Sequence, residues 1–163
     1  MKIFSKATSL KPFSFPEGFV LIIDTREQLP LFSNPVLKGL VMVRDTLQNG
    51  DYSIKGFENR IMVERKQVSD LISYVGRDHK QTRAKLDRCT GYDFRAIAIE
   101  AAEADLLSSQ LYASVPPETI RQALASFEVR YNIHLYYSRD RKDIERWILD
   151  RFVKYFRQKR EEK

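Results

Sequence analysis

Continuous apolar runs along the chain predict the strands of a central sheet. Residues 19–24, with the sequence FVLIID, are rich in β-branched side chains and end in a charge, which is typical of a strand buried on both faces. Further strand patterns occupy residues 59–66, 94–101 and 132–137. Residues 40–47 and 51–54 flank the turn-forming pair Asn49-Gly50, which indicates a hairpin or a sharp corner.

Apolar residues at helical spacing predict the helices that would cover this sheet. From Gln67 such spacing continues to Gly76, and a second, polar helix follows to about Thr90. Pro116 and Pro117 mark the start of a helix through 120–129, and residues 144–156 form a long amphipathic helix. Because the order is strands first and then alternating helix and strand, we expect an α/β fold, a mixed central sheet with helices on both faces.

The length and composition are those of one globular domain. The chain has 163 residues, of which 43% are hydrophobic. We expect residues 1–17 to form an N-terminal arm and residues 18–163 to form a single domain. The arm contains polar residues that interrupt the apolar run of a signal sequence, and no stretch is long enough to span a bilayer. The single cysteine, Cys89, excludes an intramolecular disulfide and a cysteine zinc cluster, so we expect an intracellular protein.

Charges at the end of the strand 59–66 are the first indication of chemistry. Successive strand residues point to opposite faces of the sheet, so Glu64 and Lys66 share one face and Arg65 lies on the other. The Cα atoms of Glu64 and Lys66 are then about 7 Å apart. Asp51, on the neighbouring strand, supplies a second carboxylate. Two carboxylates about 5 Å apart repel by roughly 3 kcal/mol at an effective dielectric of ~20, unless a cation lies between them. A divalent metal held by the two carboxylates over a phosphate would remove this repulsion, and the amine of Lys66 would orient or deprotonate water.

Each of these fragments also has an ordinary structural interpretation. Residues 24–27 (DTRE) are compatible with a helix capping box. Residues 49–51 are compatible with a solvated hairpin turn, and residues 64–66 with a charged strand end that protects an exposed edge. The functional interpretation therefore rests on their combination and order along the chain.

Taken together, the fragments resemble a known family. DTRE at 24–27, GDY at 50–52 and VERKQVSDL at 63–71 resemble the nuclease module of the XPF-type structure-specific endonucleases, within the PD-(D/E)XK superfamily. The resemblance continues with GRDHKQ at 76–81 and with AIAIEA at 96–101, a strand ending in Glu. It implies a restriction-endonuclease-like fold and a Mg²⁺- or Mn²⁺-dependent endonuclease that cuts branched or flap DNA at junctions of single and double strands.

The resemblance also assigns residues to the site. Asp51 and Glu64 match the metal ligands, and Lys66 matches the residue that orients the attacking water and stabilises the developing charge. We infer separately that Asp70, one turn into the next helix, holds Arg65 or Arg26 in place. The expected catalytic residues are Asp24, Arg26, Glu27, Asp51, Glu64, Arg65, Lys66 and Asp70, and the expected metal ligands are Asp24, Asp51 and Glu64.

A formal charge of +6 and a pI near 9.4 suggest a polyanionic partner, which we expect to be DNA. On the predicted second helix, basic and amide side chains fall within about a third of the circumference. This stripe consists of Arg77, Lys80, Gln81 and Arg88, with Lys85 at its margin. It would contact phosphates beside the cleft and read backbone rather than sequence, although a solvated charged face has the same pattern.

Family members carry tandem helix-hairpin-helix motifs or a helicase, and we expect neither within these 163 residues, which equally fit one fragment of a longer protein. We therefore expect a homodimer or a helix-hairpin-helix-bearing partner, and neither a membrane nor a small-molecule cofactor. The compartment would be cytoplasmic in a prokaryote or virus and nuclear in a eukaryote. Two alternatives remain open, a non-catalytic DNA-binding scaffold and a general repair or restriction nuclease of the same superfamily.

Several conspicuous side chains are expected to be structural. His79 and His134 are assigned to structure or surface rather than to a metal. The apolar stripe on the last helix indicates core, and part of it fits a subunit interface equally well. That stripe consists of Ile144, Trp147, Ile148, Phe152 and Phe156. Tyr136, Tyr137 and Tyr155 are expected to pack rather than to stack on bases.

Overall fold

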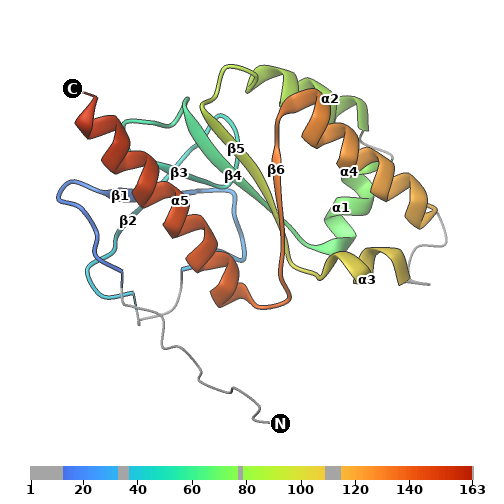
Figure 1. The fold of residues 1–163 in the computed structure, drawn as a ribbon, viewed down its shortest axis with the longest axis horizontal. Helices are drawn as coiled ribbons and strands as arrows, with labels where there is room; N and C mark the ends of the chain where they lie inside the picture. The colour runs from blue at the N-terminus through green and yellow to red at the C-terminus, as the bar shows by residue number, and fades with distance from the viewer. Residues whose placement is uncertain (1–12, 33–36, 77–78, 109–114, 163) are drawn as a thin grey trace, which may run out of the picture.

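A mixed six-stranded sheet forms the centre of the molecule (Figure 1), in a computed structural model that describes residues 13–32, 37–76, 79–108 and 115–162. The strands are β1 (Val20–Asp24), β2 (Val41–Asp45), β3 (Tyr52–Ile54), β4 (Ile61–Lys66), β5 (Phe94–Ile99) and β6 (His134–Tyr137). The helices are α1 (Val68–Val75), α2 (His79–Arg88), α3 (Glu103–Ser108), α4 (Pro117–Tyr131) and α5 (Arg141–Glu161). Of these, the short helix α3 was not predicted.

Strand direction determines which residues meet at each edge of the sheet. The spatial order is β2-β1-β3-β4-β5-β6, and only β3 runs antiparallel to its neighbours. The carboxyl ends of β1 and β4 therefore lie at the same edge as the amino end of β3. The charged residues that follow or precede these three strands are brought together there.

The segment before β3 forms a corner, and the predicted alternative of a hairpin is wrong. β2 and β3 do not pair, because β1 lies between them and bonds to both. Gly50 has a φ of +78°, and a Cβ atom at this position would lie 2.8 Å from the Sδ of Met62. Glycine is therefore required at Gly50 both by the backbone conformation and by the approach of β4.

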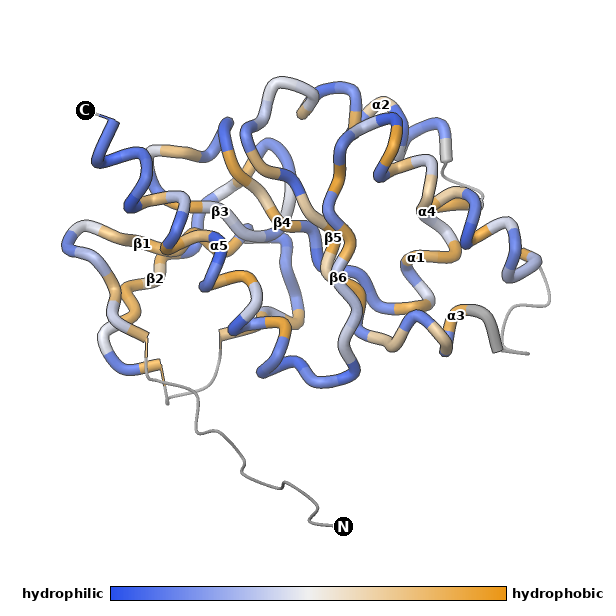
Figure 2. The backbone as a smooth tube through the Cα atoms, viewed as in Figure 1, coloured by the Kyte–Doolittle hydropathy of each residue, from blue (hydrophilic) through white to orange (hydrophobic). Residues whose placement is uncertain are grey.

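Helix α5 covers one face of the sheet. Asp140 caps its N-terminus by accepting a hydrogen bond from the backbone N–H of Lys142, so the helix begins three residues before the predicted start. The predicted apolar stripe of α5 is buried in one cluster with side chains of β1, β3, β4 and β5. Figure 2 shows hydrophobic and hydrophilic stretches alternating along this helix. The expectation that the stripe is core is confirmed, while its use as a subunit interface stays a prediction.

The remaining helices cover the opposite face, so the predicted mixed sheet with helices on both faces is confirmed. Ile97 and Ile99 of β5 pack there against apolar side chains of α1, α2, α3 and α4. On α4, the apolar side chain of Val129 is 89% exposed, whereas that of Tyr131 is buried. Arg95 lies buried beneath α2 and α4 and donates hydrogen bonds to the carbonyl groups of Leu86 and Tyr131.

The described part of the predicted arm packs on the domain. The rings of Phe13 and Phe15 stack at 5.6 Å, and Phe15 stacks on Phe19. Arg157 of α5 donates a hydrogen bond to the carbonyl of Ser14. Within the described residues, no helix is long and apolar enough to cross a lipid bilayer.

Candidate active site

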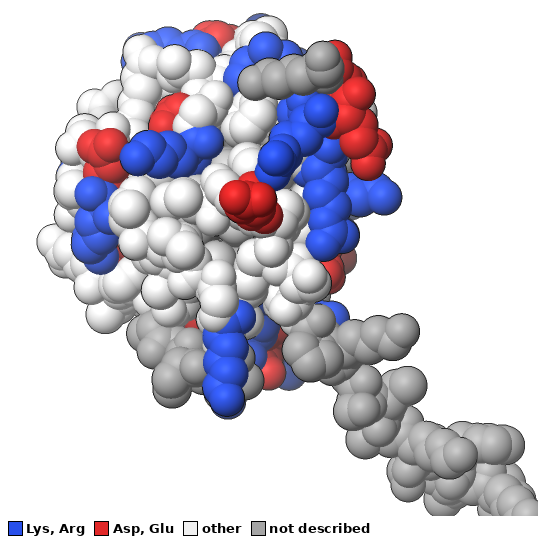
Figure 3. Space-filling model, turned by 90° about the vertical axis from the view of Figure 1, so that its left-hand side faces the viewer, with Lys and Arg blue, Asp and Glu red and all other residues white. Residues whose placement is uncertain are grey.

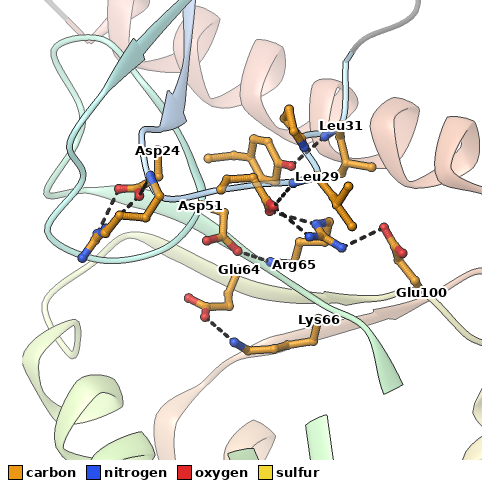
Figure 4. A network of polar contacts seen from close by, with 12 residues as sticks. Asp24, Leu29, Leu31, Asp51, Glu64, Arg65, Lys66 and Glu100 are labelled. Carbon is orange, nitrogen blue, oxygen red and sulfur yellow. Dashed lines mark hydrogen bonds and ion pairs between the residues drawn. The ribbon is translucent and has the colours of Figure 1, made fainter. Parts of the chain in front are cut away.

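Three strands deliver acidic residues to one edge of the sheet, as their directions require. Asp24 ends β1, Asp51 immediately precedes β3, and Glu64 and Lys66 lie at the end of β4. Figure 4 shows the carboxylates of Asp51 and Glu64 between Asp24 and Lys66. β4 is paired on both sides within the sheet, so the alternative in which its charges protect an unpaired outer strand is wrong.

Asp51 is fixed by the backbone of the strand beside it. Its Oδ2 accepts a hydrogen bond of 2.7 Å from the backbone N–H of Arg65, and its own N–H donates to the carbonyl of Val63 at 2.9 Å. Burial and the charge of Glu64 raise the pKa of Asp51 from 3.8 to about 7. A nearby cation stabilises the ionised form of such a buried carboxyl group more than it stabilises that of a solvent-exposed carboxyl group.

Glu64 is held between two lysines. Its side chain is 4% exposed, and its Oε1 lies 2.8 Å from the Nζ of Lys66. Its Oε2 accepts a hydrogen bond of 2.6 Å from the Nζ of Lys85, which reaches in from α2. Burial alone would raise the pKa of Glu64, but the two ammonium groups outweigh burial and lower it. Glu64 is therefore an ionised carboxylate in a mostly enclosed position.

Lys66 and Lys85 contact different carboxylate oxygens of Glu64. Its Nζ lies 4.6 Å from the ring centroid of Tyr74 on α1, a cation–π contact. Burial lowers the pKa of Lys66, but the charge of Glu64 outweighs it and the pKa is raised above its ordinary value. Lys66 is therefore a cation in this arrangement, suited to donating hydrogen bonds.

Asp24 has both carboxylate oxygens engaged. It accepts hydrogen bonds from the backbone N–H, Nε and NH2 of Arg26, at 2.8, 2.8 and 2.9 Å, and from the backbone N–H of Leu47 at 2.8 Å. Burial would raise the pKa of Asp24, and these donors lower it. No helix follows within the described residues 25–32, so the capping-box alternative is wrong. Asp24 anchors the turn after β1, and its role as a metal ligand stays a prediction.

Arg65 extends to the α5 face of β4, as strand alternation predicts. Its Nε and NH2 donate to the two oxygens of Glu27 at 2.8 Å each, and its NH1 lies 3.2 Å from Glu100. Glu100 also pairs with Arg141 at the start of α5. Burial would raise the pKa of Glu27, but the Arg65 guanidinium lowers it. Arg65 and Glu27 thus form a buried ion pair behind the edge where Asp51 and Glu64 meet.

The inferred role of Asp70 is wrong in this structure. Asp70 is exposed on α1, whereas Arg65 is held by Glu27 and Glu100 and Arg26 is held by Asp24. The short separation in sequence between Asp70 and Arg65 is therefore misleading. The charge of Asp70 contributes to the raised pKa of Lys66, which is its one described link to the site.

The donor set at the site fits a hard divalent cation. Asp51 and Glu64 provide carboxylate oxygens, the ligands that Mg²⁺ prefers. The Oδ1 of Asp51 has no hydrogen-bond partner among the described residues, whereas both oxygens of Glu64 are occupied by lysines. In the part of the chain that the structure describes, no three His, Cys, Asp or Glu side chains gather as a metal-binding group. The predicted ligands Asp24, Asp51 and Glu64 therefore do not form one such group, and metal binding by Asp51 and Glu64 stays a prediction.

The predicted basic stripe divides when it is placed on α2. Lys80, Gln81 and Arg88 are exposed, and Arg77 lies outside the described residues. Lys85 turns inward to Glu64 instead of lying on the outer surface. On the side of the molecule that faces the viewer in Figure 3, basic and acidic side chains are interspersed among uncharged ones. The net positive charge is therefore not gathered into one patch on that side.

Most side chains assigned to packing have that role. His134 is exposed and stacks on Phe94 at 4.9 Å, and the side chain of His79 lies outside the described residues. Tyr136 stacks on Trp147 at 4.6 Å. The site residues that sequence reasoning missed are Tyr74 and Arg141, together with the pairing of Lys85 and Glu64.

Comparisons with known proteins agree with this geometry. The family model described as the ERCC4 domain matches residues 23–150. Two solved structures share the fold. One is "XPF from Aeropyrum pernix, complex with DNA", with a TM-score of 0.66 and 20% identity over 86% of this chain. The other is "XPF from Aeropyrum pernix", with a TM-score of 0.56 and 22% identity over 76% of this chain.

This chain spans 66% and 55% of the length of those two structures. No curated protein matches its sequence. The family model covers the β1 acid, the GD pair, the ERK strand and the start of α5 as far as Asp150, so it includes all the charged residues that meet beside Glu64. The chain belongs to the ERCC4 domain family, and the resemblance to the XPF-type family that its motifs indicated is confirmed.

Proposed function

We propose that this protein is a divalent-metal-dependent DNA endonuclease that hydrolyses phosphodiester bonds. The observation that carries this proposal is the placement of Asp51, Glu64 and Lys66 on one face at one edge of the sheet. Two acids and one amine at the end of adjacent strands are what phosphodiester hydrolysis with a metal requires. Membership of the ERCC4 domain family supports the same activity.

A Mg²⁺ or Mn²⁺ ion held by Asp51 and Glu64 would supply Lewis-acid stabilisation and a water of lowered pKa. Lys66 is positioned to orient the attacking water and to donate hydrogen bonds to the oxygen on which negative charge develops. Its raised pKa keeps it protonated, so we assign it charge stabilisation rather than removal of a proton. The expected products carry a 5′-phosphate and a 3′-hydroxyl.

Preference for branched DNA is part of the proposal. The exposed side chains of Lys80, Gln81 and Arg88 on α2 suit contacts to the phosphate backbone, which carry no sequence information. One of the two matching solved structures is an XPF protein in complex with DNA, which supports DNA as the partner of this chain as well. We propose further that a second copy of this chain or a helix-hairpin-helix-bearing partner contributes to selecting the substrate.

One assay separates this function from its alternatives. Purified protein is incubated with flap, splayed-arm and linear duplex DNA of equal length, with and without Mg²⁺, and the products are resolved on a denaturing gel. We expect cutting of the flap and splayed substrates that requires Mg²⁺. Equal cutting of linear duplex would indicate a general nuclease. Salt-sensitive binding of the same DNAs in a native gel-shift measurement, without any cutting, would indicate a scaffold and would overturn the proposed activity.

A further inference from the structure

Lys85 is the feature of the site that the proposed reaction does not explain. It belongs to α2, not to the strands that carry the acids, yet its Nζ is the shorter of the two contacts to Glu64, 2.6 Å against 2.8 Å for Lys66. Its side chain is 30% exposed, whereas that of Glu64 is 4% exposed. Lys85 therefore reaches from the surface of α2 into the site and covers an oxygen that a metal would need.

The charges of the site explain why such a contact exists. With both acids ionised, Asp51, Glu64, Lys66 and Lys85 sum formally to zero. A divalent cation alone would leave this enclosed group with an uncompensated double positive charge, which is costly away from water. A DNA phosphate bound together with the metal halves this excess, from a formal +2 to +1, and its negative oxygens can contact both the metal and a lysine.

We propose that Lys85 is an internal counter-ion of Glu64 that excludes the metal until a DNA phosphate is present, and that Lys85 then transfers to that phosphate. This inference rests on the proposed function, since it assumes that Glu64 holds the metal. Lys85 would thus have two partners, one after the other: the Glu64 carboxylate in the protein without DNA, and a phosphate in the complex with DNA. The metal and DNA would consequently bind with positive coupling, each improving the affinity for the other.

The position of Lys85 on α2 makes this exchange feasible. Unlike Lys66, it makes no described contact with an aromatic ring, and its stem is partly exposed. The exposed residues Lys80, Gln81 and Arg88 lie on the same helix, so DNA bound along α2 would approach the Lys85 ammonium. A lysine is a suitable group for the exchange because its flexible four-carbon stem carries a compact charge.

Metal binding without DNA tests this inference directly. The affinity of the full chain for Mn²⁺ is measured from the electron paramagnetic resonance signal of free Mn²⁺, for the wild type and for three variants. Lys85→Met removes the ammonium, Lys85→Arg keeps a positive charge, and Arg83→Met removes a charge from an exposed position on the same helix. Circular dichroism melting establishes that each variant is folded.

We expect Lys85→Met to bind Mn²⁺ at least about fivefold more tightly than the wild type, the lower end of usual coupling between ligands. Lys85→Arg and Arg83→Met should stay within about twofold of the wild type. An affinity of Lys85→Met equal to or weaker than that of the wild type would overturn the inference. In that case cutting of flap DNA by the wild type would still support the proposed nuclease. Tighter Mn²⁺ binding by Lys85→Met in a protein that never cuts DNA would support the counter-ion and overturn the nuclease.

Discussion

The buried ion pair between Arg65 and Glu27 should be the most costly interaction of the site to break. Glu27→Gln keeps the shape of the side chain but removes the charge that faces Arg65. In the structure both side chains are below 10% exposed, at 5% and 8%, and two hydrogen bonds of 2.8 Å join them. Removing one partner of a buried pair usually costs about 3–5 kcal/mol.

We expect a loss near the lower end of that range, about 3 kcal/mol, because Arg65 keeps its contact of 3.2 Å with Glu100. The assay is equilibrium unfolding in urea for Glu27→Gln, Arg65→Met and the double variant. The losses of unfolding free energy in the two single variants should together exceed the loss in the double variant by at least about 1 kcal/mol. The reason is that the second change no longer leaves a buried charge without its partner.

A matched control uses an exposed pair with the same separation. Arg60 lies 2.8 Å from Asp93, but the two side chains are 53% and 32% exposed. Arg60→Met should leave the free energy of unfolding close to that of the wild type, because solvent screens such pairs. A loss below about 1 kcal/mol for Glu27→Gln, or additive effects in the double variant, would refute the reasoning that burial makes this pair essential.

Three further predictions concern stability. Gly50→Ala should lower the free energy of unfolding in urea by about 1–3 kcal/mol, because the backbone at Gly50 has a φ of +78°; an unchanged midpoint would contradict this. Arg95→Met should cost about 1–3 kcal/mol in thermal melting, because the carbonyl groups of Leu86 and Tyr131 lose their donor. The pKa of the Asp51 carboxyl is raised to about 7 in the folded protein, so between about pH 4 and 7 only the folded state keeps this proton. The free energy of unfolding of the metal-free protein should therefore fall as the pH rises from about 4 through 7. Asp51→Asn should flatten this dependence, and an equally steep curve in that variant would assign it to another group.

The strands and helices that carry the site were predictable because their apolar patterns are strong. The run from Phe19 to Asp24 and the strand ending at Lys66 have the expected form, and alternation placed Glu64 and Arg65 on opposite faces. The spatial order of the strands was less accessible. A turn signal at Asn49-Gly50 is local, whereas the insertion of β1 between β2 and β3 depends on pairings across the whole sheet.

Side-chain partners at the site could be predicted only where strand geometry fixes them. Asp51 and Glu64 meet because β3 begins beside the point where its antiparallel neighbour β4 ends. We expected Asp70 to hold Arg65 or Arg26, because Asp70 follows soon after Arg65 in the sequence. The distant residues Glu27 and Glu100 hold Arg65 instead. Lys85 was placed at the margin of a surface stripe, since a helical wheel does not show which side of a helix faces the sheet edge.

The single-turnover rate of flap cleavage by Glu64→Gln tests the central claim most directly. This variant keeps the shape of a side chain that is 4% exposed and removes the charge proposed to hold the metal. With Mg²⁺ and saturating DNA, we predict a rate at least about a hundredfold below that of the wild type, with normal folding and DNA binding. Glu128→Gln, which makes the same change at an exposed position on α4, should cut at the wild-type rate. Cleavage by Glu64→Gln at the rate of that control would contradict the account.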